Sequence, residues 1–148
     1  MFRHEATDAT HESTFFQFEG LFVDEDVSLA DLKGVVSAAL PRIVRQEVKL
    51  RFRPSYFPFV EPGIEVDMEC TARRKTHSDC SVCKGSQWVE IMGAGMIHPV
   101  VLKNVSIDPA RYRGFAFGGS VDRLAILRFG IPDIRLFWSG DPHFLQQF

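Results

Sequence analysis

The feature that most constrains this chain is an alternation of apolar and polar side chains with a period of two residues, which recurs in several segments. In residues 14–23, Phe18 and Phe22 fall on one side of an extended chain, and Gln17 and Glu19 fall on the other. An alternation of this kind is typical of a β-strand with one buried and one wet face. We therefore predict a strand here whose polar face is available for binding.

Two further segments alternate in the same way. Residues 49–53 place basic side chains between apolar ones, and residues 64–71 place acidic side chains between apolar ones. The residues between them, 54–63, include three prolines, which lack the amide donor that a central strand needs. We predict a shaped turn there, and another short strand over residues 87–92.

The spacing of other residues predicts helices. Ser28 and Asp31 resemble a capping box, in which each side chain bonds the other residue's backbone amide. Leu32 and Leu40 belong to an apolar pattern of helical spacing, so we predict an amphipathic helix that ends near Pro41. Shorter helices are predicted after the glycine-rich stretch that begins at residue 93 and beyond residue 120. Strands with so few helices predict the α+β fold class, an antiparallel sheet with helices against one face.

The composition excludes several classes of protein. The 148 residues have the length of one domain, and 17 Lys+Arg against 19 Asp+Glu give no strongly basic surface for coating nucleic acid. With 45% hydrophobic residues, the chain is too apolar to be disordered. No apolar stretch reaches the ~20 residues of a membrane span, and the first residues do not resemble an export signal. The three cysteines do not close a disulfide framework, so we expect a cytoplasmic protein with no membrane partner.

Cys70, His77, Cys80 and Cys83 have the spacing C-x6-H-x2-C-x2-C. Zinc in structural sites takes four sulfur or nitrogen ligands in a tetrahedron, which this set can supply. The alternative is three reduced thiols near an exposed loop histidine, since the histidine lies in a polar, basic stretch. The sequence leaves both interpretations open, and a zinc ion held here would be structural rather than catalytic.

Two arginines have surroundings that suit phosphate binding. Arg3 precedes the polar strand face near Phe15, so a guanidinium able to grip phosphate would lie near a ring able to stack on a base. Arg123 follows the glycines of GFAFGGSVDR, which allow a ligand to approach the backbone closely. The alternatives are a surface ion pair near the terminus for Arg3 and a packed strand-to-helix turn for the glycine-rich segment.

Four blocks of sequence together resemble one known family. FRHEATDATHESTFFQFEGL resembles motif 2 of class II aminoacyl-tRNA synthetases, and GFAFGGSVDRLAILRFGIPDIR resembles their motif 3. RFRPSYFPFVEPGIEVDMEC and WVEIMGAGMIHPVVLKNV resemble the α subunit of phenylalanyl-tRNA synthetases in particular. The resemblance extends from Phe2 to Phe148. It implies the class II antiparallel sheet flanked by helices, in a single domain over residues 1–148 that forms a partial catalytic core without motif 1.

The resemblance implies an ATP-dependent ligase that makes phenylalanyl-adenylate and transfers the acyl group to tRNA. The implied ligands and partners are ATP with Mg²⁺, phenylalanine, tRNA and a synthetase β subunit, and a homodimer is a further candidate assembly. Motif 1 and the upstream substrate-binding segment have no counterpart here, so the sequence leaves open whether these residues are active alone. Two alternatives are a shortened paralogue that binds nucleotide or aromatic amino acid without aminoacylation, and a zinc-stabilised interaction module.

By position, the resemblance assigns one group of residues to ATP. Arg3 matches the arginine on the α-phosphate and the activated carboxylate, and Arg123 matches the arginine on the γ-phosphate. These two are the implied catalytic residues. Glu5 matches the acidic residue near the adenine, and Phe15 matches the ring stacked beneath it. The implied ATP-binding residues are Arg3, Glu5, His11, Phe15, Gly118 and Arg123.

A second group is assigned to phenylalanine. Gln17 and Glu19 match the residues that meet the amino end of the amino acid. Phe57 and Phe59 match the pair whose edges surround its ring, and Ala116 matches the small residue at the floor of the pocket. The implied substrate-binding residues are Gln17, Glu19, Phe57, Phe59, Val60 and Ala116.

Two residues depart from the pattern of the family. Phe16 stands where a histidine is usual, on the strand face that we predict to be buried. Ser120 replaces a glycine of motif 3. Its side chain is expected to crowd the nucleotide if that position needs a positive φ or a close contact.

Overall fold

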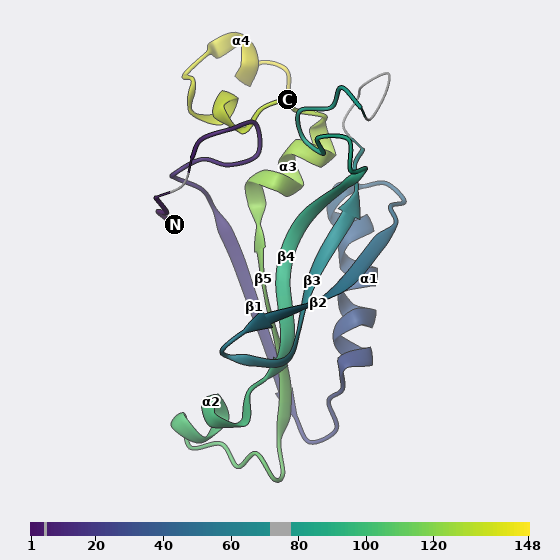
Figure 1. Cartoon of the computed structure of the whole chain (residues 1–148), viewed down its shortest axis with the longest axis vertical. Helices are drawn as coiled ribbons and strands as arrows, with labels where there is room; N and C mark the ends of the chain where they lie inside the picture. The colour runs from purple at the N-terminus through teal and green to yellow at the C-terminus, as the bar shows by residue number, and fades with distance from the viewer. Residues whose placement is uncertain (5, 72–77) are drawn as a thin grey trace.

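A computed structural model describes residues 1–4, 6–71 and 78–148 of the chain. Over these residues the chain forms an antiparallel sheet with strand order β1-β5-β4-β3-β2, and helix α1 lies along one face of it (Figure 1). The predicted fold class, an antiparallel sheet with helices, is confirmed. The strands are β1 (Gln17–Asp24), β2 (Leu50–Phe57), β3 (Val60–Glu69), β4 (Trp88–Ile97) and β5 (Arg113–Ser120).

Helices connect the strands and lie at both ends of the sheet. α1 joins β1 to β2, and α3 follows β5 directly and packs against α1. The short helix α2 lies at the other end, between β4 and β5 (Figure 1). The helices are α1 (Leu29–Val44), α2 (Pro99–Asn104), α3 (Val121–Phe129), the 3-10 helix η1 (Ile134–Trp138) and α4 (Pro142–Leu145). Within the described residues, no helix has both the length and the apolar content that a membrane crossing requires.

Helix α1 begins as predicted but ends later. The side chain of Ser28 accepts from the amide of Asp31, and a carboxylate oxygen of Asp31 accepts from the amide of Ser28 at 2.9 Å, which confirms the capping box. The predicted end near Pro41 is wrong, because α1 continues to Val44. A proline removes one helical hydrogen bond, but Leu40 and Val44 are buried in the core, and this burial stabilises the last turn.

The turn predicted over residues 54–63 is mostly strand. β2 runs to Phe57 and β3 starts at Val60, so only two residues connect them. Pro54 pairs with Ile64 inside the ladder. The proline is tolerated because β2 is an edge strand of the sheet, and an edge strand has one side that needs no amide donor.

One row of residues across the sheet determines where a ligand has space. The pairing registers align Glu19 of β1, Gly118 of β5, Gly93 of β4 and Glu65 of β3 side by side. Neighbours in such a row project from the same face of a sheet. This face therefore has carboxylates at its sides and no side chain in its middle. Residues one position along, such as Val66, project from the other face and are buried in the core with α1.

A cluster of charges joins the edge strand β2 to β3. Asp67 is buried, and its carboxylate accepts hydrogen bonds from Nε of Arg53 at 2.6 Å and from Nε of Arg51 at 2.9 Å. Arg53 also pairs with Glu65 at 2.6 Å. Burial opposes the charge of Asp67, but the bonds from the two arginines outweigh burial and hold the pKa of this carboxyl below its usual value. The basic and acidic strands of the sequence thus pair with each other.

The substitution Asp67→Asn is expected to destabilise the fold at neutral pH by about 2–3 kcal/mol, because two arginines lose a buried anion. A carboxyl whose pKa is lowered by folding stabilises the fold above its unfolded pKa of about 4, and this contribution is lost as the pH falls through the folded value. Urea unfolding measures the free energy of unfolding of the native protein and of the variant. The difference between these two free energies should therefore narrow as the pH falls below about 4.

A matched control is Glu69→Gln, since Glu69 of β3 pairs at 3.6 Å with the exposed Lys49, which directly precedes β2. Exposed pairs contribute little, so this change is expected to alter the free energy of unfolding by less than about 1 kcal/mol. If the free energies of unfolding of the native protein and of Asp67→Asn differ by the same amount at every pH, the charge of Asp67 does not stabilise the fold and the prediction is wrong.

Candidate functional site

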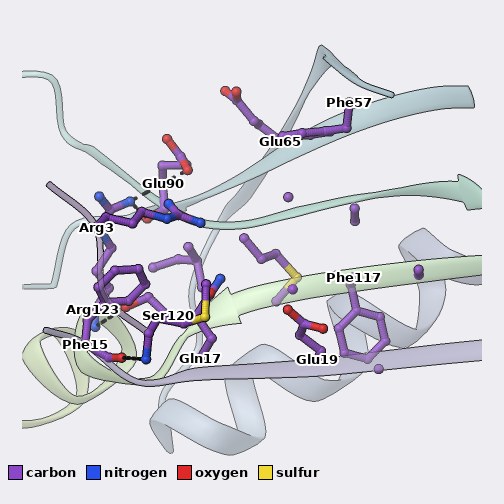
Figure 2. A pocket seen from close by; sticks show the side chains of 18 of the residues that line it. Arg3, Phe15, Gln17, Glu19, Phe57, Glu65, Glu90, Phe117, Ser120 and Arg123 are labelled. Atoms are coloured by element: carbon purple, nitrogen blue, oxygen red, sulfur yellow. Dashed lines mark hydrogen bonds and ion pairs between the residues drawn. The ribbon is translucent and has the colours of Figure 1, made fainter. Parts of the chain in front are cut away.

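A cavity of about 900 Å³ lies on the glycine-bearing face of the sheet, and Figure 2 shows side chains that line it. The floor is open at Gly118, because a methyl group added there would meet only Glu19, at 3.5 Å or more. At Gly93 the same space is already taken by the ring of Phe57, whose nearest atom would lie 2.8 Å from such a methyl carbon. The ring of Phe57 therefore covers part of the floor.

Two arginines and an aromatic ring gather at one end of this cavity (Figure 2). The guanidinium carbon of Arg3 lies 5.1 Å from the centre of the Phe15 ring. Arg123 of α3 donates from Nη1 to the backbone oxygen of Glu90 at 2.9 Å, and its Nη2 lies 3.1 Å from Nε2 of His11. This end thus combines cationic donors for phosphate with a flat apolar ring for a base.

Two hydrogen bonds with α3 bring the residues before β1 to the cavity. The amide of Phe16 donates to a carboxylate oxygen of Asp122 at 2.7 Å, and the amide of Val121 donates to the carbonyl of Phe16 at 3.0 Å. Asp122 is buried, so this link is shielded from water. It places the predicted motif 2 residues beside the first turn of the helix that carries Arg123.

Ser120 serves as the N-cap of α3. Its side chain accepts from the amide of Arg123, and its φ is −87°, in the extended region that any residue adopts. The condition of a positive φ is therefore not met. The other condition, a close contact with the nucleotide, stays a prediction, since Ser120 lines the cavity. The hydroxyl satisfies a backbone donor of the helix that carries Arg123.

The other end of the cavity is aromatic (Figure 2). The rings of Phe57 and Phe59 lie with their centres 5.9 Å apart and their planes 25° from parallel. Val60 is buried and occupies the space above Gly95. Ala116 of β5 also lines the cavity. Ring edges, an aliphatic side chain and a small residue suit a flat apolar group of limited size.

Polar groups lie at both sides of the glycine floor. Gln17 and Glu19 line the cavity from β1, and Glu65 lines it from β3. Glu65 also accepts a hydrogen bond from Oγ of Ser55 at 2.8 Å, which fixes its direction. A ligand over the floor therefore meets carboxylates on two sides, an arrangement that suits a cationic amino group.

The structure brings the predicted ligand-binding residues together. Glu5 lies outside the described residues. The others all line the cavity: Arg3, His11, Phe15, Gln17, Glu19, Phe57, Phe59, Val60, Ala116, Gly118 and Arg123. Their shared location agrees with the resemblance, and the chemical role of each stays a prediction.

The prediction for Phe16 is wrong. The residue is 60% exposed and stacks on Trp138, with ring centres 6.1 Å apart, instead of entering the core. The reason is that β1 starts only at Gln17, so the alternation predicted from residue 14 does not extend to Phe16.

Three carboxylates that line the cavity, Glu12, Glu65 and Glu90, were not predicted. Glu65 could have been found, because pairing the basic strand with the acidic strand places it opposite Arg53. Glu90 follows no such rule. Its register depends on an irregularity between Val66 and Asp67 in the pairing of β3 with β4, which no sequence pattern indicated.

The three cysteines form a cluster away from the cavity floor. Cys70, Cys80 and Cys83 are buried thiols whose sulfur atoms lie within 4.8 Å of one another. Burial alone raises the pKa of the Cys80 thiol, but hydrogen bonds from the amides of Cys83 and Val82 outweigh it, and the pKa is lowered. Three sulfur ligands at this spacing fit a zinc ion. His77, the predicted fourth ligand, lies outside the described residues.

The family model of the tRNA synthetases class II core domain (F) matches residues 1–148. The chain belongs to this family. Curated relatives named phenylalanine–tRNA ligase alpha subunit are 55% identical in Dehalococcoides mccartyi and 48% identical in Bacillus subtilis, each over 148 residues. These alignments cover 100% of this chain and 42% of each relative, so the chain spans about two fifths of their length. The resemblance stated from the sequence is confirmed.

A solved structure supports the fold of the family. A pyrrolysyl-tRNA synthetase from Desulfitobacterium hafniense superposes with a TM-score of 0.55. The match covers 90% of this chain and 40% of that chain, at 16% identity. At this identity the likeness concerns the architecture of the sheet and its helices.

Two glycines of this face are expected to respond differently to alanine. A methyl group at Gly95 would lie 2.6 Å from the carbonyl oxygen of Pro62, so Gly95→Ala should destabilise the fold by about 1–3 kcal/mol. A methyl group at Gly118 makes only ordinary contacts, so Gly118→Ala should stay within about 0.5 kcal/mol. Thermal unfolding of the two variants checks this, and equal losses would show that the floor at Gly118 is not open.

Proposed function

We propose that this chain forms part of the catalytic core of a phenylalanine–tRNA ligase α subunit. In this proposal it holds ATP and phenylalanine, joins them as phenylalanyl-adenylate, and passes the acyl group to tRNA. One observation carries the proposal: a single cavity has Arg3 and Arg123 at one end and Phe57 and Phe59 at the other. A nucleotide and an aromatic amino acid need these two chemistries side by side.

At the cationic end, the α-phosphate of ATP is proposed to meet Arg3, and the γ-phosphate to meet Arg123. Phe15 would stack beneath the adenine, with Glu5 near its edge, and His11 would face the outer phosphates. The backbone at Gly118 would lie close to the nucleotide, since no side chain separates the two. The 5.1 Å approach of Arg3 to the Phe15 ring supports this arrangement, because one ligand can reach both.

The proposed reaction needs placement and charge rather than proton transfer. A carboxylate oxygen of phenylalanine attacks the α-phosphorus, a new P–O bond forms, and the bond to pyrophosphate breaks on the opposite side. Negative charge develops on the phosphoryl oxygens and on the leaving pyrophosphate. Fixed guanidinium groups stabilise that charge most when they are already in place before reaction, and Arg123 is held in place by two hydrogen bonds.

At the aromatic end, Phe57, Phe59 and Val60 are proposed to surround the phenyl ring, with Ala116 at its floor. Gln17 and Glu19 would bind the amino group, on the polar side of the same floor. A phenyl ring has no polar handle, so selection rests on ring contacts and size, worth a few kcal/mol. Tyrosine would be rejected because its hydroxyl would be buried without a partner.

The wider assembly follows from the same proposal. Mg²⁺ would enter with the triphosphate whose oxygens it bridges. Transfer of the acyl group requires tRNA, and the names of the relatives indicate an α subunit, so we propose a β subunit as partner and a second α chain as a further candidate. Residues 1–148 are proposed to be one domain of this cytoplasmic assembly.

The decisive experiment is phenylalanine-dependent exchange of pyrophosphate into ATP, measured on the assembly as isolated. Arg123→Ala is expected to lower kcat/KM for ATP by about a hundredfold or more, because a charge-stabilising donor is lost. The control is Arg111→Ala, whose guanidinium pairs with Glu25 and does not line the cavity. Binding of ATP without exchange would instead favour a paralogue that does not aminoacylate. Absence of both ATP and phenylalanine binding would favour an interaction module.

We also propose that Cys70, Cys80 and Cys83 hold a structural zinc ion, with His77 as the fourth ligand. About one zinc per chain is then expected by elemental analysis, and Cys80→Ser should lose it. Removal of zinc by a chelator should lower the melting temperature, since the metal would link the ends of β3 and β4. A protein that contains no zinc and whose melting temperature is unchanged by chelation would instead have three reduced thiols here.

A further inference from the structure

A line of side-chain contacts runs from the cysteine-bearing turn to the cavity. Nζ of Lys84, next to Cys83, lies 2.7 Å from Oδ2 of Asp8. Oδ1 of Asp8 lies 2.9 Å from Nδ1 of His11. Nε2 of His11 in turn lies 3.1 Å from Nη2 of Arg123. Lys84 and Asp8 do not line the cavity, but Asp8 contacts His11, which does.

The chemistry of these groups determines where the His11 proton lies. A guanidinium can only donate hydrogen bonds, so Nε2 of His11 must accept from Arg123 with its lone pair. The ring proton is then on Nδ1, which donates to the carboxylate of Asp8. In the other tautomer, an N–H group would face the N–H groups of Arg123, and the contact would be lost.

Asp8 is itself held rigidly. Its Oδ1 accepts from the amides of Thr10 at 2.8 Å and His11 at 2.9 Å, which closes a tight turn around the carboxylate. Its Oδ2 pairs with Lys84. Burial opposes the charge of Asp8, but the bonds from Lys84, Thr10 and His11 outweigh it and hold the pKa of this carboxyl well below its usual value. Asp8 is therefore an anion at neutral pH.

We propose that Asp8 is a positioning residue of the nucleotide end, which keeps the His11 proton on Nδ1 and so holds the guanidinium of Arg123 at the cavity. Lys84 holds Asp8 in turn, and this links the cysteine-bearing turn to the cavity. The proposal deepens the proposed function and rests on it, because the role of Arg123 toward the triphosphate belongs to that function.

The test uses Asp8→Asn in the protein labelled with ¹⁵N-histidine. The amide oxygen of asparagine can still accept from the amides of Thr10 and His11, so the turn is retained. It no longer offers a charge to Nδ1. The ¹⁵N shifts of His11, identified by their loss in His11→Gln, should show a protonated Nδ1 and a bare Nε2 in the native protein. In Asp8→Asn they should move toward a mixture of tautomers.

The second readout is kinetic. Asp8→Asn is expected to raise the KM for ATP about tenfold in pyrophosphate exchange, with a smaller change in kcat and an unchanged melting temperature. Lys84→Met should raise it less, since Lys84 is an exposed residue that acts through Asp8. Matched controls are Glu25→Gln and Lys49→Met, which remove ion pairs that do not line the cavity, and both should leave the KM unchanged.

The outcomes separate this inference from the proposed function. Native ¹⁵N shifts in Asp8→Asn together with a native KM for ATP would overturn the positioning role. A change in the melting temperature with no change in tautomer would also overturn it, because Asp8 would then be merely structural. If Asp8→Asn does not fold, the ¹⁵N shifts of His11 and the KM for ATP are measured in Lys84→Met instead. A native protein that binds no ATP would overturn the proposed function, while the ¹⁵N shifts of His11 still decide the tautomer.

Discussion

The row formed by Glu19, Gly118, Gly93 and Glu65 is the constraint on which the site depends. A strand places a side chain above its sheet at every second residue, and a packed sheet leaves no space there. Here two neighbouring strands, β5 and β4, contribute glycines. The ring of Phe57 covers Gly93, and the cavity lies directly above the backbone at Gly118. Glycine weakens a strand. The opposite face offsets that cost, since it buries a continuous apolar core with α1.

The two ends of the cavity come from parts of the chain that are far apart in sequence. Arg3 and His11 precede β1, whereas Arg123 lies in the first turn of a helix more than a hundred residues later. Asp122, which is buried, accepts from the amide of Phe16 and so joins these segments at the start of α3. The cationic end thus forms only when the first and last strands of the chain, β1 and β5, pair as neighbours.

How much of the fold and of the site could be predicted depends on how far apart in sequence the interacting residues lie. Alternation over a few residues placed Gln17 and Glu19 on one face, and a local cap placed the start of α1 at Ser28. The prediction of a turn over residues 54–63 is wrong because prolines are tolerated in β2 as an edge strand. Being an edge strand is a property of the whole sheet. Lys84 was missed for the same reason, since it meets its partner across 76 positions.

Resemblance to a family supplied what periodicity could not. No spacing rule connects Phe57 with Arg3, yet both line the same cavity. The burial of Phe16 was predicted from the alternation and is wrong, because the place of this residue depends on where β1 begins and on a ring from η1, Trp138. Matching by position therefore selected residues that line one cavity, and their roles stay predictions. The alternation failed at a residue whose surroundings are formed by distant side chains.

Arg51 and Arg53 differ from Arg123 in the groups that accept their hydrogen bonds. Arg51 and Arg53 bind the buried carboxylate of Asp67, and an anion from solution would have to displace a charged group to reach them. The hydrogen bonds of Arg123 go to neutral acceptors, a backbone carbonyl and Nε2 of His11, and the carboxylate of Glu90 lies farther away, 3.7 Å from Nη1. Charged acceptors bind a guanidinium about twice as strongly as neutral ones, so a phosphate can replace these partners with a net gain. The neutral contacts orient the guanidinium beforehand and leave it able to bind an anion.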